Sequence, residues 1–509
     1  MDRCFWKARV AITICLSCKQ DPTTPLVFLL TWPVVGKTAA IDCNAPSVAV
    51  STQQDADSLR QCVSTQSGFN GNVTISPDAR GSLNFTGYRL IAGFVIAEDN
   101  PSLETLYFHS GLAGHIDGSV RGFILTSLSN LQAFTAPTVK ALEGGIEFRD
   151  LPKLETINMP ALLTPAYIHL DNLPRLKDIL VSSFGIRAYF DVKLRNLESL
   201  ESVDPFFSVG FPLESVSVEG IPNVHQLSYS LGEAGTVSIT GNGNLSLSYD
   251  CSTESCAELA NSPRKLTVKD LTVSGAASIS RDYSQSGAET NITVGTFTAM
   301  SNTFSDLSID FTRLTTLQVV DNPNLVSLSF GPTTRLYSLT NINISKNPAL
   351  RLNSTTSRLL PAGEQPVTTT FIWPDQDATS MEFDGQFDDS FLLVSFLQQR
   401  YRGLLADIIY NNRHSKPFID LGVNSKRPRV LSKFVVKSTL GPDEFSISST
   451  CSKLNELRRA GIIKGEYSCQ GQTVPDESKA ARMQSWGVLG LKLGMSVGIM
   501  ALSVLVGVI

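Results

Sequence analysis

Residues 146–157, with the sequence Ile-Glu-Phe-Arg-Asp-Leu-Pro-Lys-Leu-Glu-Thr-Ile, decide the fold. Ile146 and Phe148 are apolar residues spaced by two, so both side chains lie on one face of a β-strand and the residue between them faces outward. Asp150 begins a corner of turn-forming residues, as Asn172, Asn196 and Asp321 do in later coils. From Leu151 onward, an apolar residue at every third position returns the chain to the same interior.

The same pattern recurs along the chain at spacings of 21 to 28 residues. Leu151 is the sixth position of this repeat. The residues at the same position in the other coils are Asn100, Leu128, Leu173, Leu197, Ile221 and Asn242, and the pattern returns at Asn322 and Asn347. The gap before Asn322 accommodates two weaker turns, with Leu266 and Val268 before Leu271, and Ile292 and Val294 before Phe297.

One such coil cannot bury its own apolar face, so neighbouring coils must stack into a continuous core. We therefore predict an all-β fold, a right-handed β-helix or leucine-rich-repeat-like solenoid. A composition of 42% hydrophobic and 17% charged residues is too apolar for a disordered chain and agrees with a packed core.

Both ends of the chain are hydrophobic and typical of targeting segments. Residues 1–40 carry basic residues, an apolar run and then small residues up to Ala40, the order of a secretory signal peptide. The apolar residues 487–509 follow a short polar stretch and small residues near Ser478, which fits the attachment signal of a GPI lipid anchor. A single-pass membrane anchor is the alternative.

Cysteines and sequons also favour export. Six cysteines lie outside the signal segment and allow fifteen connectivities, but they fall as three sequence-local pairs. The disulfides we expect join Cys43 with Cys62, Cys251 with Cys256, and Cys451 with Cys469. The N-glycosylation candidates are Asn72, Asn84, Asn244, Asn291, Asn343 and Asn353.

Charge and motif content limit the partners. Residues 41–478 hold 34 basic and 45 acidic residues, a net charge of −11, so we expect no nucleic acid to bind. The five histidines show no metal-binding spacing, and no nucleophile or phosphate-loop motif is present in the sequence. We therefore expect no catalytic residue, no metal and no cofactor.

The Leu-Pro-x-Leu-x-x-Ile and Asn-Pro-x-Leu turns, the early cysteine pair, residues 461–471 (GIIKGEYSCQG) and the apolar tail together resemble fungal GPI-anchored cell-wall organisation proteins with receptor-L-domain-like leucine-rich repeats. The resemblance covers residues 41–388 and resumes near Leu431. It implies two consecutive L-domain-like solenoids, a location at the plasma membrane or in the cell wall, and a role in wall integrity without enzymatic activity.

We expect the following divisions: a signal peptide at 1–40, a first L-domain-like solenoid at 41–230, a second at 231–375, a C-terminal cap at 376–470, and a spacer with the GPI signal at 471–509. Residues 391–433, inside the cap, carry 8 basic and 2 acidic residues and no repeat phase, which indicates an insertion or a retained intron. Their basic run 426–429 is either a site for an anionic polymer or a solvated stretch.

The outward positions of successive strands predict an extended polar face. Its members are Glu147, Arg149, His169, Asp171, Lys193 and Arg195. Solenoids use such faces for extended ligands, although a merely solvated face is the alternative. Taken with the cell-wall role that the resemblance implies, this face leads us to expect a non-enzymatic scaffold that binds cell-wall polysaccharide or wall proteins.

Two other function classes compete with this scaffold. A GPI-anchored glucan-remodelling enzyme needs two carboxylates across a sugar bond. The acidic candidates for that role are Glu382, Asp384, Asp388 and Asp389. The other class is a ligand-binding, receptor-like ectodomain.

Overall fold

The protein is described by a computed structural model, which is nearly all parallel β-structure, with 59% strand and 7% helix, and forms a β-solenoid. This confirms the predicted solenoid. The chain divides into Met1–Ala40 and Ile41–Ile509, and every described residue belongs to the second unit. The described residues are 41–65, 68–88, 90–109, 118–162, 164–181, 191–203, 206, 212–229, 233–249, 265–281, 291–330, 339–350, 377–386, 430–438, 448–459 and 461–475.

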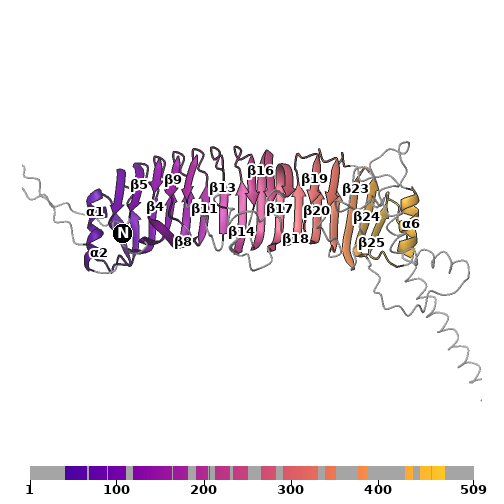
Figure 1. Ribbon diagram of the computed structural model, residues 1–509, viewed down its shortest axis with the longest axis horizontal. Coiled ribbons are helices and arrows are strands. Elements are labelled where there is room, and N and C mark those ends of the chain that lie inside the picture. The colour runs from indigo at the N-terminus through magenta and orange to yellow at the C-terminus, as the bar shows by residue number, and fades with distance from the viewer. Residues whose placement is uncertain are drawn as a thin grey trace, which may run out of the picture. The chain divides into compact units, whose positions relative to one another are not determined.

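One main sheet runs through the coils, and its strands lie side by side in chain order (Figure 1). Each strand pairs in parallel with the next. Its members are β1 (Ser47–Val50), β2 (Asn72–Ile75), β4 (Leu90–Glu98), β6 (Gly118–Thr126), β8 (Val139–Arg149), β11 (Tyr167–Asp171), β13 (Asp191–Arg195), β14 (Pro212–Glu219), β16 (Glu233–Tyr249), β17 (Lys265–Arg281), β18 (Asn291–Met300), β20 (Arg313–Val320), β22 (Asn341–Ser345), β23 (Ala378–Gly385), β24 (Val430–Ser438) and β25 (Glu466–Cys469).

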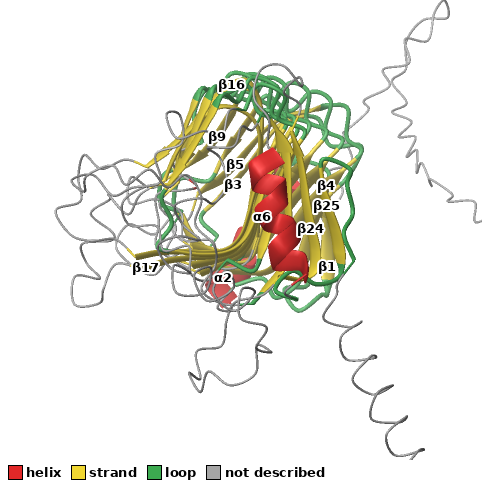
Figure 2. Ribbon diagram, turned by 90° about the vertical axis from the view of Figure 1, so that its right-hand side faces the viewer, coloured by secondary structure: helices red, strands yellow, loops and turns green. Residues whose placement is uncertain are grey.

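Shorter strands form the other walls of the coils. A second parallel sheet contains β3 (Gly81–Thr86), β5 (Leu103–His109), β7 (Ala133–Thr135), β9 (Thr156–Met159) and β12 (Asp178–Val181). The short strands β10 (Thr164–Pro165) and β15 (Gln226–Tyr229) also belong to the main sheet, where they pair with β8 and β16. Strands β19 (Asp306–Ile309) and β21 (Ser327–Phe330) form a separate two-stranded sheet. Seen along the stack, β5 and β9 lie across the interior from β4 and β25 (Figure 2).

The predicted apolar columns lie in the interior. Ile146 of β8 pairs in register with Ile168 of β11, which pairs with Val192 of β13. All three are almost fully buried. Because parallel in-register strands place equivalent positions side by side, each apolar position of the repeat becomes a column of the core.

Most of the corners after an inward pair are turned by a residue in the left-handed conformation. The non-glycine residues with φ between 49° and 58° at these corners are Asp99, Ser127, Asp150, Asn172, Asn196, Ser301, Asp321, Lys346 and Gln470. Asn and Asp adopt this conformation more readily than other non-glycine residues. The corners predicted at Asp150, Asn172, Asn196 and Asp321 are therefore confirmed.

The predicted phase of the two weaker turns is wrong by five residues. Leu271 and Phe297 do not follow their inward pairs; they begin them, since Leu271 pairs with Val237 and Phe297 pairs with Leu271. The corner that follows the first of these pairs is Gly275-Ala276, which has neither the Leu nor the Asn of the repeat. Leu266 and Val268 lie earlier in the same long strand and also alternate with polar residues. The prediction took these two residues as the inward pair, which placed the corner five residues too early.

Helices lie at the two ends of the described solenoid (Figure 1). Helices α1 (Gln53–Ser58) and α2 (Arg60–Thr65) precede β2, and α6 (Ser448–Arg459) lies beside β25. Such elements cover the terminal strands, whose edges would otherwise pair with other chains. Strands β23, β24 and β25 fall within the range predicted as a cap and extend the main sheet.

Two of the predicted cysteine pairs are disulfides in the structure. Cys43 and Cys62 have Cα atoms 5.3 Å apart, and Cys451 and Cys469 have Cα atoms 5.6 Å apart. The first ties α2 to the start of the chain's second unit, and the second ties α6 to β25. Cys251 and Cys256 lie outside the described residues. Among the residues described, no helix has the length and apolarity that a membrane span requires.

Candidate ligand-binding face

The outward residues of β8, β11 and β13 form two rows across the main sheet. Glu147 lies beside His169, which lies beside Lys193. In the second row, Arg149 lies beside Asp171, which lies beside Arg195. The stacking of all six outward positions agrees with the register that the sequence predicts. We call these six residues, with Ser217 and Glu219 of β14, the polar face.

Asp191 organises the centre of the polar face. Its Oδ2 atom is 2.7 Å from His169 Nε2 and 2.5 Å from Lys193 Nζ, and its Oδ1 accepts a hydrogen bond from Ser215 Oγ. Burial raises the pKa of this carboxyl, but the hydrogen bonds from Lys193, Ser215 and His169 outweigh burial and hold the pKa below its usual value. The carboxylate therefore stays ionised and fixes the side chains around it.

The sequence interpretation missed Asp191. It lies one position before the inward pair of β13, and its side chain faces outward with the same alternation as Lys193. Extending the outward positions by one residue toward the start of the strand would have found it. The same extension gives Tyr167 on β11 and Ser215 on β14, which pair with Asp191 on either side.

The second row is held by weaker ion pairs. Arg149 lies 3.0 Å from Glu147, and Arg195 lies 3.8 Å from both Asp171 and Glu219. The arginine side chains are about half exposed, 50% and 49%. Exposed pairs of this kind contribute about 0–1 kcal/mol each. A ligand with hydroxyl or carboxylate groups can therefore exchange for these partners at little cost.

The acidic cluster considered for glycoside chemistry divides between described and undescribed residues. Glu382 lies 2.7 Å from Lys433, and Asp384 lies 3.9 Å from Lys437. The hydrogen bond with Glu382 raises the pKa of the Lys433 ammonium despite some burial. Both carboxylates are therefore ion-paired to β24. The other two members, Asp388 and Asp389, lie outside the described residues.

The glycosylation candidates occupy different environments. Asn84 and Asn244 are exposed, and Asn72 and Asn343 are partly exposed on outward positions of β2 and β22. The Asn72 and Asn343 side chains use Oδ1 as an acceptor, from the Phe94 amide at 2.9 Å and from Ser345 Oγ at 2.7 Å. Their Nδ2 atoms, to which a glycan would be attached, take no part in these two bonds.

Several predicted positions lie outside the described side chains. Asn291 begins β18, but its side chain is not described. Asn353, Ser478 and the range 391–433 up to residue 429 lie outside the described residues, whereas 430–433 belong to β24.

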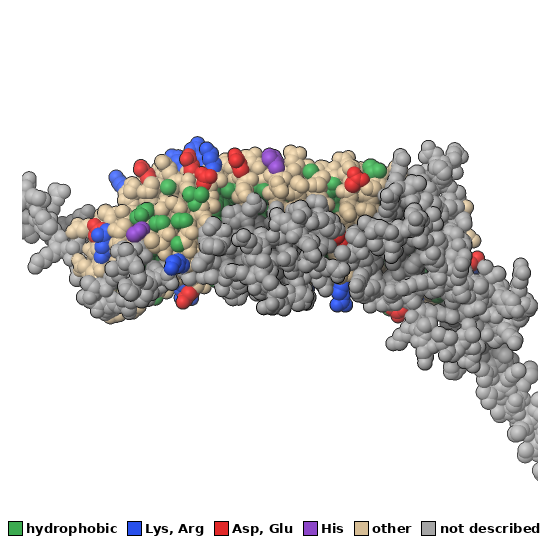
Figure 3. All heavy atoms as spheres, viewed as in Figure 1, with side chains coloured by type: hydrophobic (Ala, Val, Ile, Leu, Met, Phe, Trp, Pro, Cys, Tyr) green, Lys and Arg blue, Asp and Glu red, His purple; other side chains and the backbone are tan. Residues whose placement is uncertain are grey.

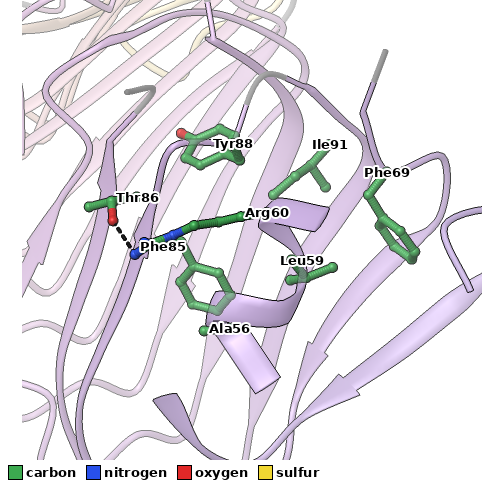
Figure 4. Close-up of a pocket in the computed structure, with 8 residues that line it drawn as sticks. All are labelled: Ala56, Leu59, Arg60, Phe69, Phe85, Thr86, Tyr88 and Ile91. Carbon is green, nitrogen blue, oxygen red and sulfur yellow. Dashed lines mark hydrogen bonds between the residues drawn. The ribbon is translucent and has the colours of Figure 1, made fainter. Parts of the chain in front are cut away.

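A small cavity lies beneath the N-terminal helices (Figure 4). Its lining residues are Ala56, Leu59, Arg60, Phe69, Phe85, Thr86, Tyr88 and Ile91. Burial raises the pKa of the Tyr88 phenol, whose hydroxyl has no hydrogen-bond partner among the described residues. The cavity volume of about 10 Å³ is close to the minimum for one water molecule. This cavity is therefore too small for an organic ligand.

Figure 3 shows the distribution of charged side chains over one side of the molecule. Over its described part, acidic and basic side chains are interspersed, and neither sign gathers into a large patch. That part offers no extended field for a highly charged polymer.

No family model, curated protein or solved structure matches the chain.

Proposed function

We propose that the chain is a non-enzymatic, GPI-anchored glycoprotein of the fungal cell surface that supports cell-wall organisation and integrity. It is held at the plasma membrane, in the cell wall, or in both. The polar face binds wall polysaccharide or wall proteins. The observation that carries this proposal is the in-register stacking of outward side chains from Glu147 to Glu219 across four consecutive strands.

Three further features support the proposal. Solenoids present extended surfaces because every coil repeats the same outward positions, which suits a polymer better than a small molecule. The two disulfides suit an oxidising compartment. Asn84 and Asn244 are exposed, so glycans on them would not disturb the core.

The enzyme alternative has less support from the described residues. Glycoside hydrolysis needs one carboxyl group that holds a proton and a second carboxylate across the scissile bond. Glu382 and Asp384 are each paired with a lysine of β24, at 2.7 Å from Lys433 and 3.9 Å from Lys437. A pair of this kind fits a structural role at the β23–β24 junction better than acid catalysis.

Binding of the purified full-length chain to β-glucan, chitin and mannan tests the proposal. Replacing Lys193 and Arg195 by Glu should abolish binding, because it reverses the two half-exposed cations of the face, 46% and 49% exposed. Lys437→Glu is the matched control, since this exposed lysine lies on the same sheet far from the polar face. Wild-type chain that binds no wall polymer and no purified wall protein would refute the scaffold role.

The anchor is tested separately on intact cells. Phosphatidylinositol-specific phospholipase C should release the chain if a GPI lipid holds it at the membrane, and glucanase should release it if it is transferred to wall glucan. Retention after both treatments would contradict the proposed attachment and favour a single-pass membrane anchor.

A further inference from the structure

Two aromatic residues lie on the outer surface of the main sheet next to the polar face. Phe94 of β4 and Tyr167 of β11 occupy the outward position directly before the inward pair of their strands. The two intervening strands carry glycine in that row, Gly122 on β6 and Gly145 on β8. Both aromatic side chains are partly exposed.

The glycines make room for the aromatic rings. A Cβ on Gly122 would lie 2.7 Å from Phe94 Cε1, and one on Gly144 would lie 2.5 Å from Phe94 Cζ. A Cβ on Gly145 would lie 2.3 Å from the backbone oxygen of Tyr167 and 2.9 Å from Tyr167 Cγ, so both the backbone and the ring approach this glycine closely. These distances are shorter than real carbon contacts. The two rings therefore lie directly against the bare backbone of β6 and β8, and we call Phe94, Tyr167 and the three glycines the aromatic shelf.

The backbone is irregular at the same place. The pairing of β4 with β6 shifts between Ile91 and Phe94, and that of β6 with β8 shifts between Val120 and Gly122. Gly145 has φ of 93°, a conformation that side chains other than glycine rarely adopt. Bulges of this kind redirect side chains and occur preferentially beside functional sites.

Polar groups contact both rings. The Arg121 guanidinium lies over the face of the Phe94 ring, with its carbon 5.1 Å from the ring centre, so a sugar that stacks on Phe94 must displace or share this contact. The His169 ring centre lies 4.8 Å from that of Tyr167, and His169 Nε2 lies 2.7 Å from the Asp191 carboxylate. The aromatic shelf therefore continues directly into the most strongly connected part of the polar face.

We propose that the aromatic shelf is the binding site for a neutral, β-linked glycan, an inference that rests on the proposed scaffold function and names its ligand class. The apolar face of a sugar ring stacks on Tyr167 and Phe94. Arg121, His169 and Asp191 bond its hydroxyl groups. A few fixed polar groups around an apolar contact surface are the usual composition of small-ligand sites.

The chemistry favours a sugar over an apolar protein partner. A stable protein interface needs about 800 Å² of surface on each partner. The shelf offers two rings that are each partly covered, and its border is charged. Tyrosine has only two side-chain torsion angles, so it loses little conformational entropy when a ligand binds. These features suit a flat ligand with an apolar face and a polar edge.

The test measures binding of the full-length chain to a soluble β-glucan oligosaccharide and, separately, to a chitin oligosaccharide by isothermal titration calorimetry. Tyr167→Ala should raise the dissociation constant for the bound oligosaccharide about tenfold, and Phe94→Ala should weaken binding similarly. Tyr167→Phe should bind nearly as wild type, because the ring supplies the contact.

Tyr107→Ala is the matched control. Tyr107 lies on β5 of the second sheet, is also partly exposed, and also neighbours a histidine, with its ring centre 6.1 Å from that of His109. The control should bind as wild type. Thermal melting of each variant, followed by circular dichroism, separates loss of binding from loss of folding.

The outcomes distinguish this inference from the scaffold function. If wild-type chain binds an oligosaccharide and folded Tyr167→Ala binds it equally well, the aromatic shelf is refuted while the scaffold function stands. Equal loss in Tyr107→Ala and Tyr167→Ala also refutes it. If the wild type binds only a purified wall protein, the glycan assignment is wrong. If it binds no wall component, the scaffold function itself fails.

Discussion

Asn322→Ala should destabilise the solenoid through a buried ladder of amides. The Asn322 side chain is fully buried. Its Oδ1 accepts hydrogen bonds from the backbone and side-chain nitrogens of Asn302 at 3.0 and 2.9 Å, and its Nδ2 donates to Ala299 O, Val320 O and Asn347 Oδ1 at 3.0 to 3.1 Å. The substitution removes all five bonds from a site that water does not reach.

The cost follows from what is left unpaired. The Asn302 backbone N–H is buried and has no other acceptor among the described contacts, and an orphaned donor of this kind costs about 1–3 kcal/mol. Asn302 Nδ2 keeps its bond to Val273 O, and Asn347 Oδ1 keeps the bond from the Asn322 backbone, so these groups are only partly lost. The substitution also removes the bonds from Asn322 Nδ2 to two backbone carbonyls. Adding this loss to the cost of the orphaned N–H, we expect the free energy of unfolding to fall by about 3 kcal/mol.

Urea denaturation followed by circular dichroism measures this loss. Asn324→Ala is the control, because Asn324 belongs to the same turn, is exposed, and within the described part of the chain makes a single side-chain contact, 3.5 Å to Thr303 O. That change should stay within about 0.5 kcal/mol of wild type. Hydrogen exchange at the Asn302 amide should also accelerate in Asn322→Ala. Equal stabilities of the two variants would show that the ladder does not stabilise the coils.

Two further predictions concern the corners and the polar face. Lys346 has φ of 57° without the local hydrogen bonding of Asn or Asp, so Lys346→Gly should raise the free energy of unfolding by about 1 kcal/mol; a loss of stability would contradict the strain argument. The folded-state pKa of Asp191 is lowered, so its contribution to stability is present above the unfolded pKa near 4 and is lost as pH falls through the folded value. Wild type should therefore have a larger free energy of unfolding than Asp191→Asn at pH 6, and that difference should shrink below about pH 4. A difference that does not change with pH would contradict the stabilising role of the ionised Asp191.

The inward columns could be predicted because each coil repeats the same two-residue alternation. Ile146, Ile168 and Val192 follow directly from that spacing, and the corners at Asp150 and Asn172 follow from turn chemistry. The regularity also explains the phase error near residue 271. Where the marker residue is replaced by alanine and a strand continues through 17 residues, several registers satisfy the alternation equally well.

The amide ladder could be predicted only in part. The spacing places Asn322 and Asn347 at the same position of the repeat, but polar side chains at a turn are more often solvated than buried. Their burial depends on the stacking of adjacent coils, which lets each amide bond the next. A single coil holds no partner for the Asn322 side chain beyond its own backbone, so the sequence of one coil does not reveal the interaction.

The aromatic shelf was beyond the sequence pattern for a different reason. Phe94 and Tyr167 are 73 residues apart, and only pairing through β6 and β8 brings them onto one surface. Between them the register shifts at bulges, which a strict alternation cannot place. Glycine weakens an isolated strand because it has no side chain to pack, so Gly122 and Gly145 have no evident role in the sequence of one coil. In the stacked sheet they are the positions that let two large rings lie against the backbone, so the departures from the repeat mark where this surface differs from a uniform solenoid wall.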